Sequence, residues 1–125
     1  QDYDKTVNRR RGVADLYHEE LKDINELALP PATNSNNNHF DIYQNYEIEA
    51  ERRDELKSFL SSKNIGTLVQ WGGKAVHEFK DLGFTQSLPI TEKIMRDSLM
   101  LPLNMTVTDV EIKYICKCIR SFYHD

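Results

Sequence analysis

The chain has 125 residues, the length of one domain, and can bury roughly two thirds of its unfolded surface. A hydrophobic share of 39% and a charged share of 29% are typical of a packed protein with an ordinary polar surface. The formal net charge of -4 argues against a nucleic-acid binder, which would carry a basic face. One basic cluster, residues 9–11, precedes Asp15, Glu19 and Glu20, and we interpret it as a solvated helix face.

Neither a membrane span nor a secretory signal is predicted. No apolar run is long enough to cross a bilayer, and the first residues lack the apolar core of a signal peptide. Cys116 and Cys118 are two positions apart on an expected helix, so they should point to different faces and cannot form a strain-free disulfide. These features favour the cytoplasm.

The first 27 residues are predicted to form a helix, because apolar side chains recur there at helical spacing. No convincing N-cap precedes them, so we expect the chain to begin inside a helix, as a fragment would. The stripe consists of Val13, Leu16, Tyr17, Leu21 and Ile24. Pro30 and Pro31 stop the helix, and residues 32–38 form a loop by composition.

From Phe40 to Glu49 the period changes to two, which predicts a strand with Tyr43, Glu47 and Glu49 on its polar face. A helix over residues 50–63 follows and ends in a left-handed turn at residues 64–66. A strand over 67–71, a break at Gly72 and Gly73, and a short helix over 74–82 come next.

The C-terminal part is predicted to contain a helix over residues 90–98, a short strand over 99–101 and a final helix. A capping box from Thr108 to Glu111 marks the start of the last helix. Its apolar stripe is Ile112, Ile115, Cys116, Ile119, Phe122 and Tyr123. The alternation of strands and helices predicts an α+β or α/β domain with helices packed on one face of a small sheet.

The glycine break is the best candidate for a site. Glycine pairs allow a backbone conformation or a close approach that branched residues do not. Gln70, Trp71, Lys74 and His77 cluster around it and offer a stacking face, hydrogen bonds and a positive charge. The plainer alternative is a structural turn, with Trp71 in the core and Lys74 on the surface.

Other motifs of catalytic chemistry are incomplete. A phosphate-binding loop would need glycine where Leu68 stands and Ser or Thr where Ala75 stands. The four histidines have no metal-ligand spacing, and no serine is flanked as a nucleophile elbow. We therefore expect no metal and no catalytic residue in this chain.

From about Val7 onward the chain resembles the small C-terminal domain of DegT/DnrJ-type (StrS-like) nucleotide-sugar aminotransferases. Seven pieces match in the family's order: residues 9–17, 43–46, 51–56, 65–71, 80–84, 99–103 and the capping box at 108–111. The resemblance implies a small antiparallel sheet with helices on one face, as in the aspartate-aminotransferase fold (fold type I). It also implies residues 1–27 as a helix leading from a missing large domain, and residues 28–125 as the small domain.

The resemblance further implies an enzyme that uses pyridoxal phosphate to move an amino group from glutamate to a keto-sugar nucleotide, as a homodimer in surface-polysaccharide or deoxyamino-sugar synthesis. The cofactor residues belong to the missing domain, so this chain alone should bind no cofactor and be inactive. Many members have histidine at the positions of Gln44 and Gln70, and a neutral amide offers only hydrogen bonds there.

Two alternatives remain at this point. One is a stand-alone interaction or dimerisation domain that has the same fold and no catalysis. The other is an unrelated α+β domain that binds a small molecule, against which the order of the matching pieces argues. If the chain is a fragment, an apolar surface should face the missing domain, and we expect Val7, Val13 and Leu16 of the first helix to contribute to it.

Overall fold

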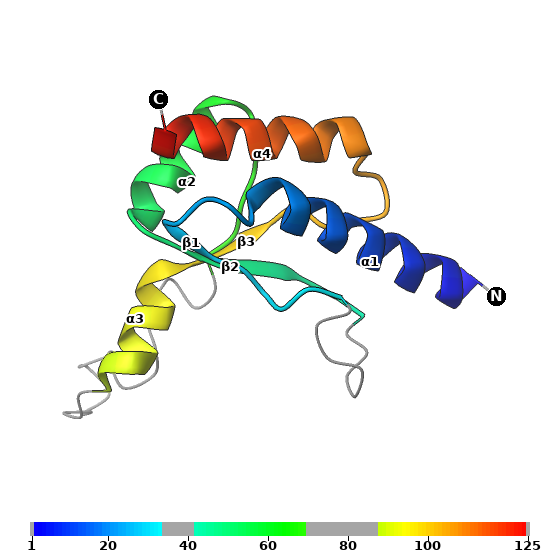
Figure 1. Cartoon of the computed structure of the whole chain (residues 1–125), viewed down its shortest axis with the longest axis horizontal. Coiled ribbons are helices and arrows are strands. Elements are labelled where there is room, and N and C mark those ends of the chain that lie inside the picture. Colours follow the sequence, from blue (N-terminus) through cyan, green and yellow to red (C-terminus); the bar gives the residue numbers. More distant parts are fainter. Residues whose placement is uncertain (1, 34–41, 70–87, 125) are drawn as a thin grey trace.

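The computed structural model describes residues 2–33, 42–69 and 88–124. Four helices and three strands lie within these ranges: α1 (Asp2–Leu21), β1 (Leu27–Ala28), β2 (Tyr46–Ala50), α2 (Arg53–Ser62), α3 (Pro89–Asp97), β3 (Ser98–Leu101) and α4 (Asp109–His124). The helices α1, α2 and α4 form a layer on one side of the sheet, whereas α3 extends away on the other side (Figure 1). The expected α+β architecture is confirmed.

The sheet is antiparallel, in the order β1-β2-β3. Residues of β2 alternate between the two faces, with Tyr46, Ile48 and Ala50 buried and Glu47 exposed. This is the pattern of a sheet that packs on a core with one face only. Because directly opposed residues of paired strands share a face, Tyr46 and Leu101 belong to the core face.

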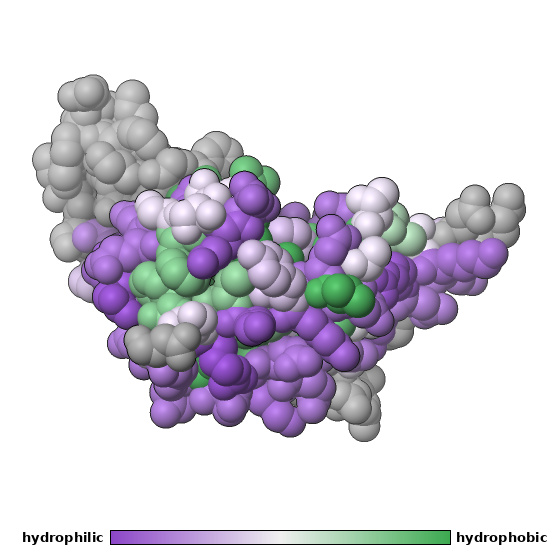
Figure 2. All heavy atoms as spheres, turned by 90° about the horizontal axis from the view of Figure 1, so that it is seen from above, coloured by the Kyte–Doolittle hydropathy of each residue, from purple (hydrophilic) through white to green (hydrophobic). Residues whose placement is uncertain are grey.

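The core lies between the sheet and the helix layer. Helix α1 packs against α4, and α2 packs against α4 and against strands β2 and β3. The largest side chains that are fully buried come from all of these elements: Tyr17, Tyr46, Leu21, Ile24, Ile48, Leu56, Leu60, Leu99, Ile112, Ile119 and Val13. The solvent side of the layer is mainly hydrophilic, with a smaller hydrophobic area near its middle (Figure 2).

Helix α1 is shorter than the sequence predicts, because it ends at Leu21 and not at residue 27. Ile24 lies on the extrapolated stripe and is buried, but in a turn: its N–H bonds to the carbonyl of Leu21. Leu27 and Ala28 then pair with β2 as an edge strand. The periodicity correctly predicted that Ile24 is buried, but it did not show that the helix ends before this residue.

The apolar stripe of α1 is not an exposed interface. Val7 is 6% exposed and Val13 1% exposed, while Leu16 is partly buried and packs against the core. The expectation that these residues face a missing domain is therefore wrong, because α4 and the core already cover them.

Strand β2 begins at Tyr46, whereas the sequence predicts a strand from Phe40 onward; the described residues 42–45 precede β2 and are not part of it. Tyr43, expected on the polar face, is 4% exposed and has a left-handed backbone with a φ of 51°. A side chain held in that conformation leaves the alternation of a strand, so the period-two argument fails at this position.

The C-terminal half agrees more closely with the sequence. Asn64 has a φ of 64° after α2, as a left-handed helix end requires. At α4, the Thr108 hydroxyl accepts the Glu111 N–H at 3.2 Å, and the Glu111 carboxylate accepts the Thr108 N–H at 2.9 Å. This confirms the capping box. The predicted helix over residues 74–82 lies outside the described residues.

The two cysteines, expected on different faces of the last helix, are both free and buried. Burial raises the pKa of the Cys116 thiol to about 12, which keeps it protonated. No helix among the described residues has the length and apolar content needed to cross a membrane.

Candidate functional site: the open face of the sheet

The residues that the sequence places at the site are Gln70, Trp71, Lys74 and His77. All four lie outside the described residues, so their grouping stays a prediction. The structure does describe the residues that lead into and out of this segment. On the N-terminal side, Leu68 pairs with Met100 through two backbone hydrogen bonds of 3.2 and 2.8 Å.

That pairing places Leu68 on the face of the sheet opposite to the core helices. Glu47 is directly opposite Met100 in the register, and Met100 is opposite Leu68, so these three side chains share one face. Glu49 and Ser98 are the next opposed pair along the same face. We call this surface the open face; Leu68 is 64% exposed on it.

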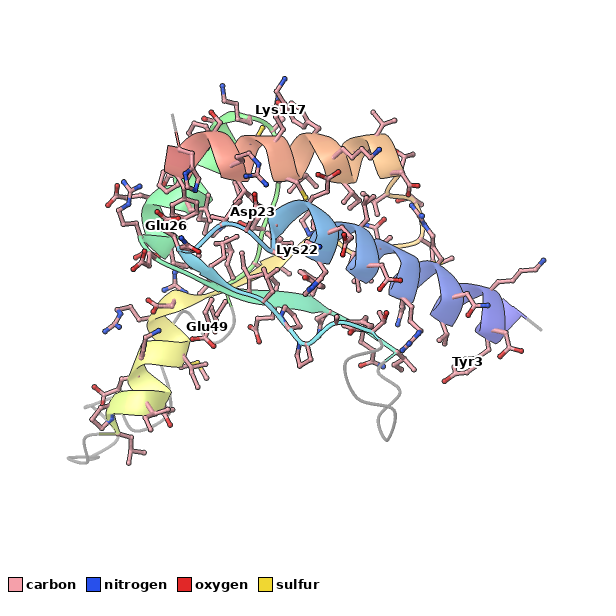
Figure 3. All side chains as sticks on the ribbon, viewed as in Figure 1. Tyr3, Lys22, Asp23, Glu26, Glu49 and Lys117 are labelled. Carbon is pink, nitrogen blue, oxygen red and sulfur yellow. The ribbon has the colours of Figure 1, made fainter. Side chains whose placement is uncertain are left out.

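Two carboxylates of the open face differ in their surroundings. Glu49, which is labelled in Figure 3, lies 3.6 Å from the Lys93 ammonium group of α3, which also donates to Asp97 at 3.0 Å. The bond to Asp97, with its charge and that of Glu49, raises the pKa of Lys93. Glu47 is exposed and has no ion pair with any residue in the described ranges. Within the described residues, Glu47 is therefore a carboxylate of the open face without an ion pair.

Asp97 links α3 to this face. Burial alone would raise the pKa of its carboxyl, but hydrogen bonds from Lys93 and Arg96 outweigh burial and lower it. Its side chain is 14% exposed, so this charge is held mainly by its two cationic partners.

One end of the open face is shaped by the backbone of Tyr43. Its buried ring donates a hydrogen bond from the hydroxyl to the Pro31 carbonyl at 2.8 Å. The left-handed conformation at Tyr43 turns the chain so that Gln44 and Asn45 are exposed. Non-glycine residues keep such a conformation only where the surrounding structure fixes it, and functional sites are where they often occur.

Beside this turn lies a groove of about 280 Å³. It is lined by Gln44, Asn45, Asn104 and the apolar pair of Leu68 and Met100, among others. Side-chain amides both donate and accept hydrogen bonds without a charge. The groove therefore suits neutral polar groups better than phosphates.

Arg53 fixes the junction between α3 and β3. It is 7% exposed, and its guanidinium donates to the carbonyls of Met95 at 3.0 Å and Ser98 at 2.7 Å. A third bond, of 2.7 Å, reaches the Asp54 carboxylate. Sequence reasoning missed this residue, because Arg53 belongs to α2 while two of its acceptors, the carbonyls of Met95 and Ser98, lie more than forty positions away.

The described residues give no sign of metal chemistry, since no group of three or more metal-ligating side chains is assembled among them. A pyridoxal phosphate site needs an imine-forming lysine with an acid and a phosphate cradle around it. Lys22 pairs with Glu19, Lys57 donates to the Thr67 carbonyl, and Lys93 belongs to the ion pairs of α3. These lysines do not fit that cofactor.

Known structures share this fold. The S. venezuelae protein DesV, solved in complex with a ketimine intermediate, superposes with a TM-score of 0.87 at 24% sequence identity, over 99% of this chain and 33% of that protein. The chain therefore has the fold of about one third of that protein.

The sequence comparison goes further than the fold. The sequence model of the DegT/DnrJ/EryC1/StrS aminotransferase family matches residues 1–120, and the chain belongs to this family. The family depends on pyridoxal phosphate.

Two relatives give the extent of the match. The "Pleiotropic regulatory protein" of Geobacillus stearothermophilus is 29% identical over 125 residues, which are 96% of this chain and 33% of the relative. The "dTDP-4-dehydro-2,3,6-trideoxy-D-glucose 4-aminotransferase" of Saccharopolyspora spinosa is 25% identical over 109 residues, which are 87% of this chain and 28% of the relative. The chain thus spans about a third of the length of the relatives it matches.

Proposed function

We propose that this chain is the C-terminal third of an enzyme that transfers an amino group from glutamate to a keto-sugar nucleotide. The observation that carries the proposal is the family match over residues 1–120. A relative named as an aminotransferase of a dTDP-linked keto-sugar supports the substrate class. Pyridoxal phosphate supplies the chemistry that moves the amino group, and in this proposal the longer protein holds it.

The share of this chain is to form one wall of the substrate cleft. The open face carries a polar groove and leads through Leu68 into the segment with Gln70, Trp71, Lys74 and His77. In this proposal Trp71 stacks on an apolar ring face, Gln70 forms hydrogen bonds and Lys74 faces the diphosphate. Residues 1–27 lead from the large domain, and the enzyme works as a cytoplasmic homodimer.

The second candidate is a non-catalytic interaction domain with the same fold. It is favoured by one relative, which bears the name of a regulatory protein. On this candidate the open face binds a protein, and no amino transfer depends on it.

The test is an assay of the longer protein that contains this chain. The proposal expects conversion of glutamate to 2-oxoglutarate that requires both added pyridoxal phosphate and a keto-sugar nucleotide such as dTDP-4-keto-6-deoxyglucose. A folded protein that binds the nucleotide sugar but forms no 2-oxoglutarate with any keto-sugar nucleotide would contradict it and favour the interaction domain. The isolated 125-residue chain is the negative control, since it should form none.

A further inference from the structure

Helix α3 has an unusual distribution of exposure. Apolar side chains lie at its start and one turn further on, yet none of its residues is buried. Ile90 is 78% exposed, Leu88 48% and Ile94 40%. An amphipathic helix of a globular protein normally packs its apolar side on a core. This helix leaves that side open.

The charged residues of α3, in contrast, all have partners. The Glu92 carboxylate accepts the Leu88 N–H at 2.7 Å, in the manner of an N-terminal cap. Lys93 and Arg96 both donate to Asp97, at 3.0 and 3.2 Å. If the helix were covered, Lys93 and Arg96 would keep their ion pairs with Asp97, and it is unpaired buried ions that are most costly.

The apolar side of α3 is continuous with the open face. A second groove, of about 270 Å³, lies between Ile94 on α3 and the segment of Leu29 and Pro30, with Glu49 and Ser98 beside it. Figure 1 shows that α3 leaves the sheet on the side away from α1 and α4. One surface therefore combines exposed aliphatic residues of α3 with the groove and the open face.

We propose that α3, through Ile90 and Ile94, is the docking element for the remaining two thirds of the same polypeptide. The proposal rests on the proposed function for the identity of that partner. The length of the relatives supports this choice of partner. The part that matches this chain is about a third of each relative, so about two thirds of their sequence lies outside it. The apolar residues of α1 that the sequence suggested for this role, Val7, Val13 and Leu16, are already buried or half-buried within this chain.

The chain offers a closely matched control. Ile90 is the second helical residue of α3 and Val110 the second of α4, and their exposed fractions are 78% and 77%. An aspartate at either position lies near a helix N-terminus, where a negative charge is tolerated or favourable. Neither Ile90→Asp nor Val110→Asp should therefore unfold the 125-residue chain.

The experiment compares both variants in this chain and in the longer protein. Ile90→Asp should lower the midpoint of thermal unfolding of the longer protein by at least about 2–4 °C and leave that of the isolated chain unchanged. Val110→Asp should change neither. In wild type, backbone amides of α3 should exchange with solvent about tenfold more slowly in the longer protein than in the isolated chain, while those of α4 exchange equally.

Three results would overturn the proposal. Equal rates of amide exchange for α3 in both proteins would mean that the longer polypeptide does not cover this helix. Equal effects of the two aspartates on the longer protein would remove Ile90 from any interface. Concentration-dependent dimers of the isolated chain that Ile90→Asp abolishes, without protection by the longer polypeptide, would assign the surface to a second copy. Loss of amino transfer with α3 protected would contradict only the proposed function.

Discussion

At the scale of single residues, the side chain of Arg53 supplies hydrogen bonds to backbone carbonyls at the point where α3 meets β3. Its guanidinium donates to the carbonyls of Met95, in the last turn of α3, and of Ser98, the first residue of β3. Ser98 is also opposite Glu49 in the sheet, so this arginine fixes the edge of the open face. A planar group with several donors suits this role better than a lysine, which is a point charge.

Replacing Arg53 with methionine keeps the length of the side chain and removes every donor. We expect the free energy of unfolding to fall by about 1–3 kcal/mol, because buried carbonyls lose their partners. Arg52 is the control: its side chain is 52% exposed, and its 3.4 Å pair with Glu55 and its cation–π contact with Phe122, at 4.6 Å, are each worth at most about 1 kcal/mol at such a site. Denaturant unfolding of Arg53→Met and Arg52→Met measures both, and an equal loss would show that burial of Arg53 contributes nothing.

The capping box allows a prediction that depends on pH. Thr108→Ala should cost about 1 kcal/mol near neutral pH, the usual value for an N-cap hydroxyl. Bonds from the Thr108 backbone and hydroxyl lower the pKa of Glu111 below its ordinary value. A carboxyl whose pKa is lower in the folded than in the unfolded protein stabilises the fold at pH values above its unfolded pKa. This stabilisation is lost as the pH falls through the folded pKa.

The loss of free energy of unfolding caused by Thr108→Ala should therefore become smaller between pH 7 and pH 3. Acid removes the stabilising contribution of Glu111 from the wild type, and the variant has less of that contribution to lose. Urea unfolding at several pH values measures it. Lys117→Ala, an exposed change on the same helix, should show no such trend. A penalty that grows on acidification would contradict this account of the cap.

At the scale of elements, the last helix was predictable because its signals are local. The cap and the stripe both lie within α4 itself. The positions of Tyr43 and Ile24 were not predictable in this way. Tyr43 depends on a left-handed turn held by its bond to the Pro31 carbonyl. Ile24 depends on a turn that precedes a two-residue edge strand. Periodicity reports burial, and burial does not by itself distinguish helix from turn.

The stripe of α4 should outweigh its cap. Ile115 is 5% exposed within the core, and Ile115→Ala removes three carbon atoms from a packed site. We expect a loss of about 2–5 kcal/mol, against about 1 kcal/mol for Thr108→Ala. Denaturant unfolding of the two variants gives the order, and the reverse order would mean that the face of α4 has been placed wrongly.

At the scale of the whole molecule, the open face follows from long-range pairing that the sequence does not reveal. The alternation in β2 predicted that Glu47 and Glu49 lie on the polar side. Only the register with β3, and the bridge from Leu68 to Met100, brings them beside the start of the segment with the glycine break. The candidate site was therefore predictable as a segment of sequence but not as a surface.

The last prediction tests whether that segment belongs to the cleft. In the longer enzyme, Lys74→Ala should raise KM for the keto-sugar nucleotide far more than KM for glutamate, because only the nucleotide carries a diphosphate for a lysine to neutralise. Steady-state kinetics with each substrate varied in turn separates the two effects. The matched control is Lys117→Ala, which removes an exposed lysine on the helix-covered side and should change neither constant (Figure 3). Equal changes for both substrates, or none for either, would remove Lys74 from the cleft and leave the glycine break as a structural turn.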